Sequence, residues 1–120
     1  MRLEGNFYTI HAITTGNPGE YTISAELFAD HPIYKGHFPE QPVVPGVCTL
    51  TVIRECLAKI VGREVTFTAI KECKYLSALI PQSNIPITIN ITIADDSQLC
   101  ATVVNGNSSQ SVLKLRATIS

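Results

Sequence analysis

The chain has 120 residues, of which 45% are hydrophobic and 16% are charged, and its formal net charge is −1. This composition is typical of a folded globule and excludes a disordered chain, and the length predicts a single domain over residues 1–120. Because the charged fraction is low for a lone small domain, we expect another subunit to cover part of the surface. The basic residues form no run, which argues against binding to nucleic acid or to a membrane surface.

No apolar run approaches the roughly 18 residues that a membrane span needs. The first ten residues, "MRLEGNFYTI", lack the charged-then-apolar layout of a signal peptide, so we expect a cytoplasmic protein. The four cysteines, Cys48, Cys56, Cys73 and Cys100, show neither a CxxC pair nor a zinc-like cluster with histidine. We therefore expect reduced, mostly buried thiols, and neither a metal nor a cofactor.

The first half of the chain predicts two strands and a helix. The strands are expected over Phe7–Thr14 and Tyr21–Phe28, separated by the turn-like "TGNPGE". A Pro- and Gly-rich stretch, "HPIYKGHFPEQPVVPG", then leads into the helical pattern of "GVCTLTVIRECLAKIVG". Pro45 suits the start of this helix and Gly62 its end. Apolar residues lie nearly all round it, which is typical of a buried helix.

The second half predicts strands only. Isoleucines alternate with other residues from position 85 to position 93, the period of a half-buried strand. "ADDSQ" and "NGNSS" are turns that lead to strands over Leu99–Val104 and Val112–Ile119, and another strand over about Glu64–Leu76 follows the helix. Short connections make these neighbours antiparallel.

These elements predict an α+β domain in which an antiparallel sheet of about six strands curls around one central helix. A single helix covers only one face of such a sheet. The open edge of the sheet therefore favours pairing with a second copy, and we expect a homodimer or a higher oligomer.

The helix start offers a site for chemistry. The first backbone N–H groups of a helix have no intrahelical partner and carry partial positive charge, so they can polarise a carbonyl group. Gly46 would allow a ligand to approach the backbone closely. His37 precedes this point on a proline-stiffened loop, and histidine titrates near neutrality. Together they suit the removal of a proton next to a thioester or ketone carbonyl. A single loop histidine is nevertheless more often structural or solvated.

The segment "GHFPEQPVVPGV" resembles the H-F-P-x-x-P-x-x-P-G signature of the hot-dog-fold 3-hydroxyacyl-acyl carrier protein dehydratases. The matching positions are His37, Phe38, Pro39, Pro42, Pro45 and Gly46, followed by Val47. "KYLSALIP", from Lys74 to Pro81, is similar to a second and weaker family segment. The order of strands and helix agrees with this family over essentially the whole chain.

The resemblance implies a hot-dog fold and the dehydration of a 3-hydroxyacyl thioester to the trans-2-enoyl thioester. It implies that acyl carrier protein delivers the substrate and that His37 works with a carboxylate from the central helix across a dimer interface. It also implies that the helix start holds the carbonyl. The expected substrate-binding residues are Phe38, Pro45, Gly46, Val47 and Thr51.

This chain departs from the family at the carboxylate. The family places Glu or Asp fourteen residues after the histidine, where this chain has Thr51. Glu55 lies one turn further along the same helix face, about 6 Å along the axis. Our hypothesis is that Glu55 replaces the carboxylate and that Thr51 positions a water or the substrate hydroxyl. The alternative is a structural i,i+4 ion pair between Glu55 and Lys59.

The predicted function is therefore dehydration of a 3-hydroxyacyl thioester in fatty acid or related lipid or polyene biosynthesis, with His37 and Glu55 as catalytic residues. Two alternatives stay open. One is an acyl thioesterase of the same fold, in which His37 or Glu55 activates water. The other is a subunit that binds acyl carrier protein without catalysis.

Overall fold

The computed structural model describes residues 2–36 and 42–120. Within these ranges lie six strands, β1 (Tyr8–Thr15), β2 (Glu20–Leu27), β3 (Phe67–Tyr75), β4 (Ile85–Ala94), β5 (Gln98–Asn105) and β6 (Ser111–Ile119). Two helices, α1 (Ile33–Gly36) and α2 (Gly46–Val61), join the first pair of strands to the rest. The predicted strands are confirmed with ends that differ by a few residues.

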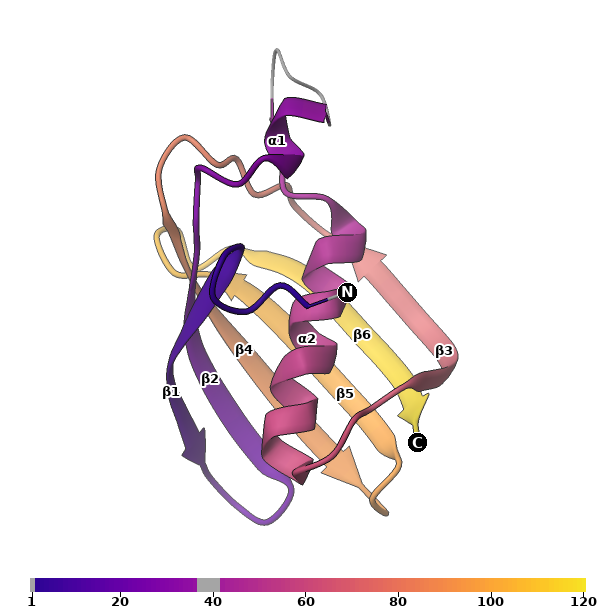
Figure 1. Ribbon diagram of the computed structural model, residues 1–120. Helices are drawn as coiled ribbons and strands as arrows, with labels where there is room; N and C mark the ends of the chain where they lie inside the picture. The colour runs from indigo at the N-terminus through magenta and orange to yellow at the C-terminus, as the bar shows by residue number, and fades with distance from the viewer. Residues whose placement is uncertain (1, 37–41) are drawn as a thin grey trace.

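The six strands form one antiparallel sheet in the order β1-β2-β4-β5-β6-β3. Helix α2 lies across one face of this sheet, which curls around it (Figure 1). Through α2 the chain thus passes from β2, the second strand, to β3, which is the edge strand on the opposite side of the sheet. This arrangement confirms the predicted sheet wrapped around a central helix.

Strand β4 shows why the sheet has an inner and an outer face. Ile85, Ile87, Ile89 and Ile91 are at most 4% exposed, whereas the residues between them are half-buried or exposed. The same alternation runs through β6, where Leu113, Leu115, Ala117 and Ile119 are buried. Their buried side chains face α2 and form the core, because successive strand residues point to opposite faces.

Helix α2 begins and ends at the predicted residues. Pro45 is the N-cap, and Gly62 is the C-cap in the left-handed region, with φ 76° and its N–H donating to the Ala58 carbonyl. The buried stripe is formed by Cys48, Thr49, Val52, Ile53, Cys56 and Leu57. Val47, in contrast, is 64% exposed. The expectation of burial all round the helix is therefore wrong at Val47 in the first turn.

The structure adds to the sequence analysis at the short helix α1, at the four cysteines and on membrane-spanning helices. The short helix α1 was not predicted, because four residues are too few to show a helical period. Cys48 and Cys56 are buried free thiols as expected, but Cys73 is half-buried and Cys100 is exposed. Among the helices of the described ranges, none is long and apolar enough to cross a membrane.

Candidate active site at the start of helix α2

The first turn of α2 has two backbone donors without an acceptor among the described residues. Pro45 has an extended backbone, with φ −63° and ψ 138°, and provides no side-chain cap. Its carbonyl accepts the N–H groups of Cys48 at 3.0 Å and Thr49 at 3.2 Å. The amides of Gly46 and Val47 have no acceptor among the residues that the structure describes. These two amides carry the positive end of the helix dipole, so they are suited to hold a carbonyl oxygen.

A pocket of about 370 Å³ opens beside this turn. Gly46 and Thr49 form its helical side, and the segment after β3 forms the opposite side. The lining residues are Val43, Val44, Gly46, Thr49, Tyr75, Leu76, Ser77, Ala78, Leu79 and Val112. Most of these side chains are apolar, and Val44 N–H donates to the Leu79 carbonyl at 2.9 Å, which ties the two sides together. The pocket is therefore a mostly apolar space that ends at a helix start.

Of the predicted substrate-binding residues, only Gly46 lines this pocket among the described residues. Gly46 lines it, Pro45 is buried directly before it, and Val47 points outward from the chain. The Thr51 hydroxyl donates to the Val47 carbonyl at 2.9 Å, so its hydrogen is used within the helix. His37 and Phe38 lie outside the described residues.

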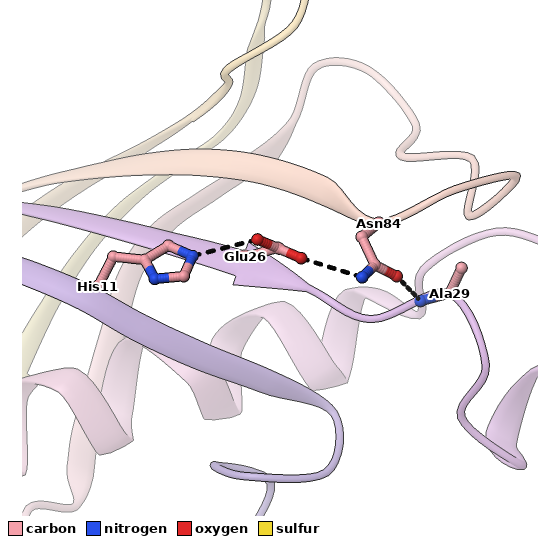
Figure 2. A network of polar contacts seen from close by, with 4 residues as sticks. All are labelled: His11, Glu26, Ala29 and Asn84. Atoms are coloured by element: carbon pink, nitrogen blue, oxygen red, sulfur yellow. Dashed lines mark hydrogen bonds and ion pairs between the residues drawn. The ribbon is translucent and has the colours of Figure 1, made fainter.

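The segment that leads toward position 37 is anchored to the sheet. Phe28 N–H donates to the Phe7 carbonyl at 2.9 Å, and Ala29 N–H donates to Asn84 Oδ1 at 2.9 Å. Figure 2 shows how Asn84 in turn donates to Glu26, at 2.9 Å, and how Glu26 meets His11 at 3.1 Å. His11 is therefore a hydrogen-bond partner of Glu26 on β1.

His31 belongs to the same anchor. Its Nδ1 accepts the Ile33 N–H at 3.1 Å, and its ring meets the Phe7 ring edge-on with centroids 5.3 Å apart. Tyr34 is buried beside Phe7, with ring centroids 6.1 Å apart. These contacts fix the direction in which the chain leaves the sheet toward α1 and position 37.

Glu55 is engaged by the N-terminal segment. Its carboxylate accepts the Leu3 N–H at 2.7 Å, the Glu4 N–H at 3.0 Å and the Tyr8 hydroxyl at 2.9 Å. Lys59 forms its ion pair with Glu4, at 2.7 Å, instead of the Glu55–Lys59 pair that was the structural alternative for Glu55. Figure 1 shows this segment passing beside α2.

The cluster around Glu55 is tightly packed. Burial, followed by the charges and hydrogen bond of nearby groups, raises the pKa of the Tyr8 phenol far above its ordinary value. Burial likewise raises the pKa of the Cys56 thiol to about 12. Both groups therefore stay protonated near neutrality, and Tyr8 remains a donor to Glu55.

Glu55 and the helix start border two different pockets. Glu55 lines a second pocket of about 680 Å³, with Arg2, Glu4, Lys59 and residues near the end of α2. It lies nine residues after Gly46, which is about 13 Å along a helix axis. Within one chain, the structure does not bring Glu55 to the pocket at Gly46.

Tyr75 is a pocket residue that was not predicted from the sequence. A Cβ placed on Gly46 would lie 2.6 Å from Tyr75 Cε1 and 2.8 Å from its hydroxyl oxygen. The ring thus occupies the space that we expected a ligand to use at Gly46. The only signal in the sequence was the weak family echo in "KYLSALIP", which includes this tyrosine.

The sequence is similar to those of known dehydratases. A family model described as ApeI-like, ApeI dehydratase, matches residues 14–112. The 3-hydroxyacyl-acyl-carrier-protein dehydratase FabZ of Alkaliphilus metalliredigens is 30% identical over 71 residues, which cover 53% of this chain and 48% of that protein. The FabZ of Ehrlichia canis is 26% identical over 97 residues, which cover 72% and 66%. The chain thus spans about half to two thirds of the length of these relatives.

Among solved structures, the dehydratase heterocomplex ApeI:P from Xenorhabdus doucetiae is similar in fold, with a TM-score of 0.77 at 18% identity. The match covers 92% of this chain and 95% of that chain. The hot-dog fold that the sequence motif predicts is therefore confirmed.

Proposed function

Because this chain belongs to the ApeI-like dehydratase family, we propose that it removes water from a 3-hydroxyacyl thioester carried by acyl carrier protein. The product is the trans-2-enoyl thioester of a fatty acid or a related lipid or polyene. The observation that carries the proposal is the start of α2, where two amides without an acceptor among the described residues meet a mostly apolar pocket. The names of the FabZ relatives support the carrier protein as the source of substrate.

The proposed chemistry divides between the helix start and His37. The thioester oxygen accepts hydrogen bonds from the amides of Gly46 and Val47, which stabilise the negative charge that develops there. The imidazole of His37 takes the proton from C2. The C3 hydroxyl then leaves as water when an acid donates a proton to it, and the C2–C3 double bond forms.

Two assignments of that acid compete. In the first, Glu55 supplies the proton, as the sequence suggests, because it is the one acidic residue between Gly46 and Val61. In the second, Glu55 holds the N-terminal segment, and a second chain supplies a carboxylate near Thr51. The three hydrogen bonds to Glu55 and its separate pocket favour the second assignment.

We propose that the second chain pairs through the edge strand β3. Ile70, Tyr75 and Leu76 are 50%, 56% and 48% exposed at this edge, and Val47 is exposed at the helix start nearby. A second copy is the partner that the sequence predicts. A related but different dehydratase chain would instead provide the missing carboxylate, and the heterocomplex reported for the Xenorhabdus doucetiae protein supports this possibility.

The test incubates the protein with 3-hydroxyacyl-acyl carrier protein and follows the acyl group by mass spectrometry. It is done with the chain alone and with any chain that co-purifies from its native host. We expect loss of one water, and we expect His37→Ala to abolish it. Glu55→Gln is expected to retain turnover if a second chain supplies the acid, and to lose it if Glu55 does.

The same assay separates the alternative functions. Release of the free carrier thiol would identify a thioesterase and contradict the proposal. Binding of acyl carrier protein without any change of the acyl group, unaffected by His37→Ala and with every co-purifying chain present, would identify a non-catalytic subunit.

A further inference from the structure

The backbone of Tyr75 is held at the end of the edge strand β3. Its backbone pairs with Leu113 of β6, and the next residue, Leu76, donates its N–H to the Val112 carbonyl at 2.8 Å. Burial is the main cause that raises the pKa of the Tyr75 phenol. The backbone that carries the ring is therefore fixed in the sheet.

The ring lies directly on the first residue of α2. The space where residue 46 would carry a Cβ is filled by the ring, with distances of 2.6, 2.7 and 2.8 Å to Cε1, Cζ and the hydroxyl oxygen. Real Cβ atoms do not approach other heavy atoms so closely. A side chain at position 46 would therefore force the Tyr75 ring to move.

The same ring lines the pocket beside the first-turn amides. A substrate oxygen that binds these amides brings the carbon atoms next to its carbonyl against the ring. We propose that Tyr75 is a specificity-determining residue, whose ring limits the size of the group at C2 of the thioester. This inference rests on the proposed function, because it places the thioester carbonyl at Gly46.

The first experiment measures binding with unreactive analogues. Butanoyl-pantetheine amide and its 2-methyl counterpart are titrated into the protein, and dissociation constants are obtained from NMR shifts. We expect the wild-type protein to prefer the unbranched amide. Tyr75→Ala should shift the ratio of dissociation constants about tenfold toward the branched amide, the scale of discrimination for one methyl group in an apolar pocket.

Two matched variants separate the ring from other effects. Tyr75→Phe keeps the ring and should leave the ratio unchanged, whereas Ile13→Ala tests an exposed apolar residue of β1 that does not line the pocket. A ratio unchanged in Tyr75→Ala, or shifted equally in Tyr75→Phe or Ile13→Ala, would overturn the inference. So would a wild-type protein that binds neither amide. A protein that binds the amides but dehydrates nothing would contradict the proposed function. The ratio of dissociation constants would still test the role of Tyr75.

The second experiment needs no ligand. Gly46→Ala is introduced into the wild-type and Tyr75→Ala proteins, and thermal midpoints are compared in a double-mutant cycle. Alanine is the better helix former, so it should raise the midpoint by a few degrees once the ring is absent. In the wild-type background the ring must move, and the midpoint should fall or stay unchanged. Equal shifts in both backgrounds would show that the ring does not occupy this space.

Discussion

At the scale of single residues, Glu55 shows how a carboxylate can be held by the chain that surrounds it. Its three donors are the backbone amides of Leu3 and Glu4 and the hydroxyl of Tyr8. These residues precede Glu55 in the sequence by 52, 51 and 47 positions. Hydrogen bonds to a charged acceptor are stronger than neutral ones, and a buried donor left without its acceptor is costly. Glu55 therefore fastens the N-terminal segment to α2.

We expect Glu55→Ala to lower the free energy of unfolding by about 2–3 kcal/mol, because three donors lose their acceptor together. Tyr8→Phe removes one of these bonds and should cost about 1 kcal/mol. Urea denaturation measures both changes. Glu64→Ala serves as the control, because this side chain is exposed and should change stability by less than about 0.5 kcal/mol. A loss no greater than that of the control would contradict the anchoring role.

Glu26 gives a prediction about acid stability. Hydrogen bonds from His11 and then Asn84 hold the pKa of the Glu26 carboxyl below its ordinary value. A lowered folded-state pKa stabilises the fold above the unfolded value, and this contribution is lost as the pH falls through the lowered value. The difference in thermal midpoint between wild type and Glu26→Gln should therefore be constant above the unfolded-state pKa of Glu26. It should shrink as the pH falls through the lowered folded-state pKa. A difference that grows on acidification would contradict this assignment.

At the scale of elements, the end of α2 depends on one backbone conformation. Gly62 has φ 76°, and a Cβ added there would meet nothing within 4 Å. The cost of Gly62→Ala is thus a backbone cost, which we expect to be about 1 kcal/mol in urea denaturation. Gly16→Ala is the control, since its added Cβ makes only ordinary contacts with Glu20, at 3.8 Å, and its φ is not positive. Equal effects of the two substitutions would refute the capping role.

Elements with a repeating pattern were predictable from the sequence. The isoleucines of β4 predicted a strand with an inner face, and Pro45 and Gly62 predicted the limits of α2, because alternation and caps act within a few residues. The side of α2 left open at Val47 was not predictable. Its exposure depends on which elements cover the helix, and such contacts leave no periodic signal.

The site was predictable only in part for the same reason. Gly46 was expected to matter because it starts the helix, but the ring that covers it comes from Tyr75, far along the chain at the sheet edge. The partners of Glu55 are backbone amides and a tyrosine in the N-terminal segment, where no side-chain pattern marks them. The assignment of His37 stays a prediction, since it lies outside the described residues.

At the scale of the whole molecule, the two edges of the sheet differ in character. Strand β1 exposes mainly threonine, histidine and alanine, with Ile13 as its exposed large apolar residue. Strand β3 exposes Ile70 and Tyr75 beside Thr68, Ala69, Lys71 and Lys74, and Leu76 and Ile80 continue its apolar part beyond the strand. An edge strand with unpaired backbone groups and apolar neighbours favours pairing with another chain. The proposed subunit contact therefore belongs at β3.

The two isoleucines offer a matched test of that contact. Ile70→Lys places a charge at the β3 edge, and Ile13→Lys places the same charge at the β1 edge, where the native side chain is 40% exposed compared with 50% for Ile70. Light scattering should show that Ile70→Lys reduces the assembly to a single chain, because the buried charge would lack a partner. Ile13→Lys should leave the assembly unchanged, and circular dichroism should show both variants folded. Dissociation by Ile13→Lys alone would place the contact at the opposite edge, away from Tyr75 and the start of α2.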